Sequence, residues 1–158
     1  MAFDFNADDV LKIAEQIEEN GADFYNKASA AMTDPHYKKF LADLAVMEVD
    51  HKKTFAGMRA ALSETEKKPT VFDPNDESVL YLNALADLRV FYKKEMDTSS
   101  IEKILASAIE AEKDSIVFYV GMKDLVPDKL GKNKIDAIID EEKKHIILLG
   151  KELLSLKK

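Results

Sequence analysis

Apolar residues recur at intervals of three and four positions along most of the chain, and this spacing predicts amphipathic helices rather than strands. The pattern indicates four long helices. The first covers residues 6–32, with Asn6 as its N-cap, and the second covers residues 35–62. The third begins at Ser99-Ser100-Ile101-Glu102, which has the form of a capping box, and the fourth covers residues 132–156.

Short breaks separate the helices within each half of the chain. Thr33-Asp34-Pro35 reads as a stop and restart, with Asp34 as a cap and Pro35 at the first position of the next helix. Pro127 and Gly131 mark the break before the fourth helix. Because both breaks are short, each pair of helices is expected to form an antiparallel hairpin.

A much longer connection joins the two hairpins. Residues 63–98 form this crossover, which has two prolines near its start and a shorter predicted helix at about 78–93. Hairpins over residues 6–62 and 99–156, joined in this way, indicate an all-α four-helix bundle with one long crossover. A chain of 158 residues has the size of one domain, so we expect residues 1–158 to fold as a single unit.

Two of the predicted apolar stripes are interrupted by the pair Glu-x-x-His. Glu48 and His51 interrupt the second helix, and Glu142 and His145 interrupt the fourth. Residues three apart lie on one helix face, so both side chains of a pair can reach one metal ion. Burying them is costly unless they are paired or bind something. The remaining stripe positions are apolar: Leu41, Leu44, Phe55 and Met58 in the second helix, and Ile135, Ile138 and Leu149 in the fourth.

The chain also repeats itself, without a gap, at a distance of 94 residues. This shift superimposes the two Glu-x-x-His pairs, places Phe24-Tyr25 on Phe118-Tyr119, and places Glu18 on Glu112. One Glu from each of two helices, with Glu-x-x-His from each of the other two, is the ligand pattern of dinuclear carboxylate sites in helix bundles. We therefore expect six metal ligands: Glu18, Glu48, His51, Glu112, Glu142 and His145.

The chemistry of these six side chains suits a pair of divalent cations. Four carboxylates balance the charge of two such ions, and two neutral imidazoles complete the set. Carboxylate and imidazole ligands suit Fe(II) or Mn(II), and this ligand set also accepts Zn(II), so the residues alone leave the choice among these metals open. Without metal, the buried carboxylates would repel one another and some would have to bind protons.

Three further residues are candidates for supporting the ligands. Tyr25 and Tyr119 are either plain core aromatics or hydroxyl donors to ligand carboxylates. Glu141 is either a solvated surface residue or an acceptor for a ligand histidine. His36, beside Pro35, is expected to be a solvent-exposed residue at a helix start.

Composition narrows the chemistry further. The chain has no cysteine, which excludes thiolate zinc sites, cysteine nucleophiles and cysteine-ligated iron–sulfur centres. A net charge of −7 argues against a nucleic-acid partner. No apolar run is long enough to span a bilayer, and the acidic N-terminus lacks the features of a signal peptide, so we expect a cytoplasmic protein.

On these residues the chain resembles the ferritin-like superfamily of di-iron carboxylate proteins, and within it the rubrerythrins. The resemblance covers nearly the whole chain. It implies that the six residues are iron ligands, that Glu48 and Glu142 bridge the two ions, and that Tyr25 and Tyr119 are the family's site-adjacent tyrosines. The segments that carry it are Glu18-Glu19-Asn20-Gly21-Ala22-Asp23-Phe24-Tyr25, Glu48-Val49-Asp50-His51, Glu112-Lys113-Asp114-Ser115-Ile116-Val117-Phe118-Tyr119 and Glu142-Lys143-Lys144-His145.

Two features depart from the rubrerythrin pattern. Rubrerythrins carry a further glutamate one turn after the ligand of the third helix, where this chain has Ser115. They also carry a rubredoxin-like domain with a four-cysteine iron centre, which a chain without cysteine does not have. Any reductant is therefore expected to be a separate protein or small molecule.

The resemblance implies a non-haem di-iron oxidoreductase that reduces hydrogen peroxide or dioxygen with electrons from an external donor. Two other functions remain open. One is a ferroxidase for iron handling, in which iron is the substrate, and the other is a non-catalytic bundle stabilised by metal. By analogy with the family we also expect a homodimer.

Overall fold

The computed structural model describes residues 3–5, 7–64, 71–73, 80, 97–123 and 132–157. Four long helices dominate the described chain: α1 (Ala7–Ala31), α2 (Pro35–Ala60), α4 (Ile101–Lys123) and α5 (Lys132–Ser155). Their bounds agree with the periodicity of the sequence to within two or three residues. The all-α bundle prediction is therefore confirmed for the part of the chain that the structure describes.

The turn between α1 and α2 forms as the sequence predicts. Asp34 is the N-cap of α2, and its side chain accepts a 2.8 Å hydrogen bond from the backbone N–H of His36. Pro35 occupies the first turn of α2, where its missing N–H has no helical partner to lose. The three residues between the helices are enough to reverse the chain into a hairpin.

The N-terminus of α4 lies one residue further along the chain than predicted. Ser100, rather than Ser99, is the cap: its hydroxyl accepts a 3.2 Å hydrogen bond from the N–H of Lys103. The N–H of Ser99 instead donates to the side chain of Asp97. Two adjacent serines can each cap a helix, and the turn at Asp97 places the second of them at the helix start.

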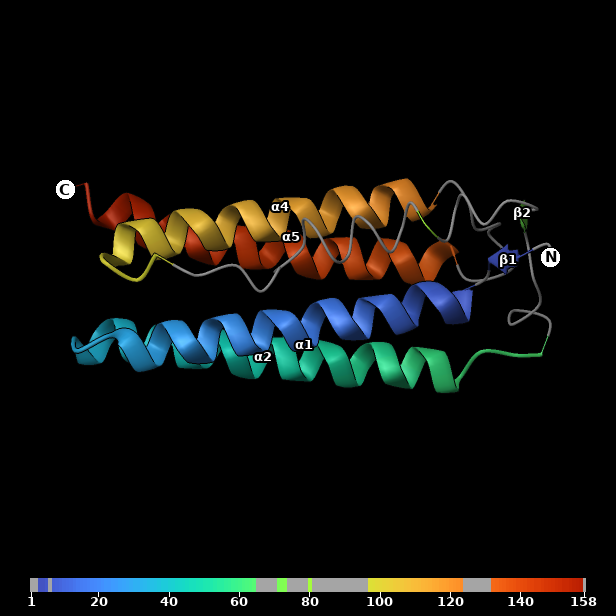
Figure 1. Ribbon diagram of the computed structural model, residues 1–158, viewed down its shortest axis with the longest axis horizontal. Coiled ribbons are helices and arrows are strands. Elements are labelled where there is room, and N and C mark those ends of the chain that lie inside the picture. Colours follow the sequence, from blue (N-terminus) through green and yellow to red (C-terminus); the bar gives the residue numbers. More distant parts are fainter. Residues whose placement is uncertain are drawn as a thin grey trace.

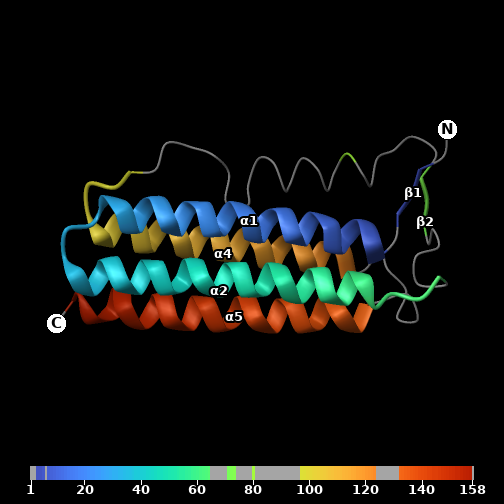
Figure 2. The same ribbon diagram turned by 90° about the horizontal axis from the view of Figure 1, so that it is seen from below.

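The two hairpins pack against each other as two layers (Figure 1). One layer holds α1 and α2 and the other holds α4 and α5, with all four helices running along the same long axis. The view turned by 90° shows α1 over α4, and α2 beside α5 (Figure 2). The colours along the chain show that α2 and α5 run in opposite directions along the same length of the bundle.

The interior of the bundle is formed by the apolar stripes that the sequence predicts. Fully buried side chains include Leu11 of α1, Leu44 of α2, Leu105 of α4 and Ile138 of α5. Removing such side chains from water stabilises the fold by about 2 kcal/mol each. None of the described helices is both long enough and apolar enough to cross a membrane.

A short β-pair, which the helical pattern does not predict, lies at the end of the bundle where α1 begins. Strand β1 (Phe3–Phe5) pairs antiparallel with β2 (Val71–Asp73), with Asp4 opposite Phe72. Segments of three residues are too short to show a strand period. The predicted crossover helix at 78–93, the predicted cap Asn6, and the break at Pro127 and Gly131 lie outside the described residues, apart from residue 80.

Candidate metal centre

The structure brings the six residues that the sequence singles out to one place in the middle of the bundle. Each of the four helices contributes: Glu18 lies on α1, Glu48 and His51 on α2, Glu112 on α4, and Glu142 and His145 on α5. Five of the six are buried, with at most 2% of their surface exposed. The sixth, His51, is half-buried, with 12% of its side chain exposed.

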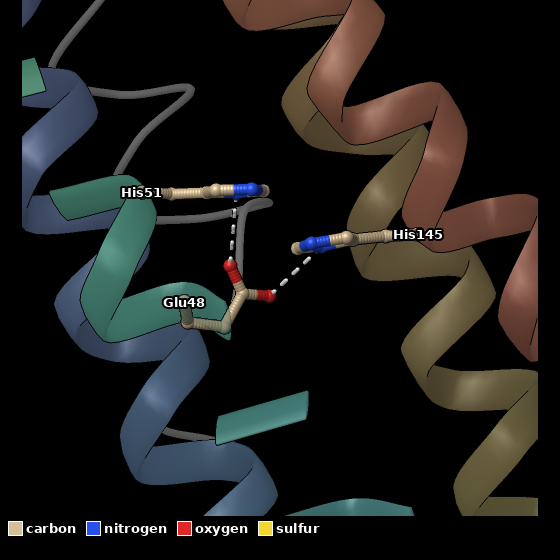
Figure 3. Close-up of side chains that lie close together, drawn as sticks. All are labelled: Glu48, His51 and His145. Atoms are coloured by element: carbon tan, nitrogen blue, oxygen red, sulfur yellow. Dashed lines mark ion pairs between the residues drawn. The ribbon is translucent and has the colours of Figure 1, made fainter. Parts of the chain in front are cut away.

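The carboxylate of Glu48 faces both histidines (Figure 3). Its Oε1 is 3.4 Å from Nδ1 of His145, and its Oε2 is 3.9 Å from Nδ1 of His51. The two imidazole rings stack almost parallel, with their centroids 4.4 Å apart and an interplanar angle of 9°. One carboxylate from α2 thus faces ligand-type nitrogens from both hairpins.

The oxygen and nitrogen atoms of the cluster fall into overlapping groups, each with its atoms within 4.8 Å of one another. There are three such groups: Glu48 with His51 and His145; Glu18 with Glu48, His51 and Glu142; and Glu112 with Glu142 and His145. Glu48 and Glu142 each belong to two of the three. Among the described residues, every group of three or more carboxylate or imidazole side chains at this spacing is drawn from these six.

The polar atoms of the cluster lack the partners that buried groups normally have. Within the described chain, ten buried side-chain nitrogen or oxygen atoms have no hydrogen-bond partner, and nine of them belong to these six residues. Both oxygens of Glu18, Glu48 and Glu142 are among the nine. Burying an unpaired charge costs several kcal/mol. Among the described residues such unpaired atoms gather at this one point, and a bound cation would offset the cost.

The pKa values of three carboxyl groups in the cluster, those of Glu18, Glu112 and Glu142, reflect burial and the same excess of negative charge. Burial, with the charges of Glu142 and Glu48, raises the pKa of Glu18 well above its ordinary value. Burial, with the charge of Glu112, does the same to the pKa of Glu142. Burial also raises the pKa of Glu112 itself, although a hydrogen bond from His145 partly opposes this. Without a cation, protons would occupy part of the site.

The two histidines respond differently to this environment. Burial would lower the pKa of His145, but its contacts with Glu112 and Glu48 outweigh burial and raise that pKa to about 11. The pKa of His51 is lowered, first by burial and then by the charge of His145. His51 is therefore neutral near pH 7, the form that binds a metal ion.

Glu141 determines which nitrogen of His51 faces the cluster. Its Oε2 lies 3.3 Å from Nε2 of His51, while Nδ1 of His51 points inward, 3.7 Å from Glu18. A carboxylate beside Nε2 favours the tautomer with its proton there and leaves the Nδ1 lone pair free for a metal ion. Of the two sequence interpretations of Glu141, the geometry favours the acceptor for a histidine.

The two tyrosines are both fully buried beside the cluster, but their hydroxyls differ. The Tyr25 hydroxyl donates a 2.9 Å hydrogen bond to Oε1 of Glu112. The Tyr119 hydroxyl is the tenth buried polar atom without a hydrogen-bond partner among the described residues. Burial raises the pKa of both hydroxyls well above their ordinary value, so both keep their protons.

His36 and Ser115 are the two remaining residues that the sequence singles out. His36 is solvent-exposed, as predicted, and its Nε2 pairs with Glu152 of α5 at the far end of the bundle, a partner that sequence spacing gives no sign of. Ser115 is fully buried, and its hydroxyl donates a 3.1 Å hydrogen bond to the backbone carbonyl of Ala111. The Ser115 hydroxyl therefore has its hydrogen-bond partner within α4.

No family model matches the chain, and no curated protein matches it. Among solved structures, the chain is similar to the crystal structure of a candidate ferritin-like diiron-carboxylate protein from Thermotoga maritima. The two superimpose with a TM-score of 0.62 over 95% of each chain, and 25% of the aligned residues are identical. The chain therefore has a ferritin-like helical bundle fold, with a cluster of carboxylates and histidines at its centre.

Proposed function

We propose that the chain is a rubrerythrin-like non-haem di-iron oxidoreductase that reduces hydrogen peroxide or dioxygen. One observation carries the proposal: nine unpartnered buried atoms converge from four helices on one point. The likeness to a structure described as a diiron-carboxylate protein supports the same assignment of the metal. The residues that hold the metal in this proposal are Glu18, Glu48, His51, Glu112, Glu142 and His145.

The geometry supports a division of the six into two positions. Glu18 and His51 would hold one cation, while Glu112 and His145 would hold the other. Glu48 faces both histidines, and Glu48 and Glu142 each belong to two of the three groups of donors, which supports these two carboxylates as the bridging ligands. The four carboxylates would neutralise two divalent ions, and the ions would remove the repulsion among the carboxylates.

A pair of bound iron ions would supply two electrons to peroxide or dioxygen and would orient it between them. The chain itself supplies the enclosure and the protons. Buried aromatic residues beside the cluster exclude bulk water, among them Phe55, whose ring centroid lies 6.3 Å from that of His51. The hydroxyl of Tyr119 keeps its proton inside the site and has no hydrogen-bond acceptor among the described residues, so it can donate to a bound oxidant.

The electrons that return the oxidised iron to Fe(II) must come from another molecule, because the chain has no cysteine for an iron–sulfur centre. We expect a separate reductant, either a protein or a small molecule. Ser115 is buried and bonded within its helix, so it does not replace the additional glutamate of rubrerythrins. The rearrangement of ligands associated with that glutamate is therefore not part of the proposed mechanism.

Rapid mixing tests the proposal. Anaerobic protein loaded with Fe(II) should develop diferric absorbance much faster than free Fe(II) does when it is mixed with peroxide or with air. His145→Ala should abolish the acceleration, because it removes one nitrogen donor of the site. Oxidation no faster than that of free Fe(II), with both oxidants, would exclude the proposal.

A ferroxidase is the second candidate, and the partial exposure of His51 favours it. A site with one ligand open to solvent could release oxidised iron and take up more Fe(II). Adding Fe(II) in stepwise excess under air distinguishes the two. Turnover of many Fe(II) ions per chain indicates a ferroxidase, whereas two ions oxidised once indicate a resident cofactor. Native zinc with no redox activity would point to a non-catalytic metal-stabilised bundle instead.

A further inference from the structure

The two halves of the metal centre are related by the repeat of 94 residues, but their surroundings differ. On the His145 side, the ligand-type atoms are held in place and closed off from solvent. His145 is 2% exposed, and its Nδ1 lies 3.2 Å from Oε1 of Glu112. The same oxygen accepts the 2.9 Å hydrogen bond from Tyr25. This half is enclosed and rigid before any metal binds.

The His51 side is more open and less constrained. His51 is the one member of the cluster with appreciable exposure, and its outer nitrogen contacts Glu141, whose side chain is 40% exposed. Neither oxygen of Glu18 has a hydrogen-bond partner among the described residues, and neither does the hydroxyl of Tyr119. The Tyr25–Glu112 hydrogen bond thus has no counterpart here.

The repeat itself explains the difference beside the histidines. A shift of 94 residues places Glu141 on Met47. Met47 is partly buried and packs against the apolar core, so no carboxylate occupies the corresponding place beside His145. Nε2 of His145 is buried without a hydrogen-bond partner in the described chain. Within the described residues, a carboxylate thus connects His51 to the surface and none connects His145 in the same way.

We propose that divalent cations enter the metal centre past Glu141 and His51, so that the cation bound by Glu18 and His51 exchanges readily while the one bound by Glu112 and His145 does not. The proposal rests on the six residues binding two cations, as proposed above. A cation approaching the site would first meet the Glu141 carboxylate, which attracts it and replaces part of its water shell. His51 and then Glu18 provide the next donors inward.

The contacts of Glu141 allow it to take part in such a transfer. One of its oxygens faces His51 and the other pairs with Lys144 at 3.0 Å. Exposed pairs of this kind contribute little stability, about 0–1 kcal/mol, so the carboxylate can leave Lys144 at small cost. A residue that lowers the barrier to entry lowers the barrier to exit as well, because both directions share one transition state.

Cobalt(II) provides a probe that does not depend on oxidation chemistry. Stopped-flow absorbance would follow the association of Co(II) with metal-free protein. The same absorbance after the loaded protein is mixed with excess chelator would follow the release of Co(II). The wild type should show two phases in each direction, with one cation per phase. Glu141→Gln should slow the faster phase roughly tenfold in both directions, the scale of electrostatic effects on association rates. Its equilibrium affinity should change little.

Matched variants separate an entry role from a structural one. Glu141→Asp keeps the charge and should restore most of the rate. Glu110→Gln removes an exposed glutamate that also pairs with a lysine three residues away at 3.0 Å, but on the outer face of α4, and should leave both phases unchanged. His51→Ala should eliminate the fast phase and His145→Ala the slow one, with folding checked by circular dichroism.

Two results would overturn the proposal. One is an unchanged fast phase in Glu141→Gln. The other is faster release with weaker affinity in that variant, which would show that Glu141 only orients His51. Failure of the chain to bind two Co(II) ions would instead refute the metal assignment on which the proposal rests. Slow oxidation of iron with normal Co(II) binding would refute the proposed activity and leave the entry route intact.

Discussion

Tyr25 of α1 donates a 2.9 Å hydrogen bond to Glu112 of α4, across 87 residues of sequence and from one hairpin to the other. Both side chains are fully buried. The bond fixes one carboxylate of the cluster against the opposite layer of the bundle. The corresponding pair, Tyr119 and Glu18, has no such bond, although the repeat relates the two pairs residue for residue.

Tyr25→Phe should therefore cost more stability than Tyr119→Phe. Removing the Tyr25 hydroxyl breaks a hydrogen bond to a buried carboxylate, which should lower the free energy of unfolding by about 1–3 kcal/mol. Removing the Tyr119 hydroxyl leaves no acceptor unsatisfied and should be nearly neutral. Chemical denaturation of the metal-free variants measures both effects. Equal losses of unfolding free energy in the two variants would show that the hydroxyls of Tyr25 and Tyr119 do not differ in their contribution to stability.

Glu142→Gln should change stability in opposite directions with and without metal. Burial and the charge of Glu112 raise the pKa of Glu142, so its charged form is disfavoured in the metal-free site. A neutral amide of the same shape should raise the unfolding free energy of the metal-free protein by about 1 kcal/mol or more near neutral pH.

The same substitution should reduce the stabilisation that added metal gives, because it removes a donor shared by two of the three groups of ligands. Denaturation with and without Mn(II) would measure the two effects, with Glu110→Gln as a surface control of the same chemistry. A variant that is less stable without metal and equally stabilised by metal would contradict the role of Glu142.

Metal-free protein should lose stability as pH rises from about 4.5 toward neutral. The folded state raises the pKa of Glu18, Glu112 and Glu142, so it holds protons that the unfolded chain releases. The contribution of these three carboxyl groups to stability is complete below their pKa in the unfolded chain, near 4.5. It is lost as the pH rises through their pKa values in the folded protein. His145, with a pKa of about 11, acts with the same sign, since its contribution is complete below about 6.5 and is lost toward 11.

A bound cation displaces these protons, so metal should stabilise the protein more at higher pH. Thermal unfolding with and without Zn(II) at about pH 5.5 and about pH 7.5 would compare the shifts in Tm. We expect the larger shift at the higher pH. A shift independent of pH would mean that metal binds without displacing protons, and therefore somewhere other than this cluster.

Much of the fold and the composition of the candidate site could be predicted from sequence because both depend on local periodicity. Residues three apart on a helix share a face whatever the helix packs against, so Glu48 and His51 had to point the same way. The gap-free repeat then placed Glu18 level with Glu112 by the same logic. The interrupted stripes at Leu44 and Ile138 follow from this pattern and are buried in the structure.

Features that depend on how the helices are rotated and placed side by side could not be predicted in the same way. Glu141 lies at the border between the buried and exposed faces of α5, so its contact with His51 depends on the lateral position of α5 against α2. The repeat also gives no sign that Tyr25 has a hydrogen-bond acceptor while Tyr119 has none among the residues that the structure describes. The strand Phe3–Phe5 depends on pairing with Val71–Asp73, far along the chain, and leaves no local signal.

The most direct test of the metal centre is the anomalous scattering of a crystal grown with Mn(II) or Fe(II). We expect two peaks in the middle of the bundle, about 3.5–4 Å apart, as in known dinuclear sites. One peak should lie among Glu18, Glu48 and His51 and the other between Glu112 and His145, with Glu142 next to both. A single peak, or peaks only on the surface of the bundle, would contradict this expectation.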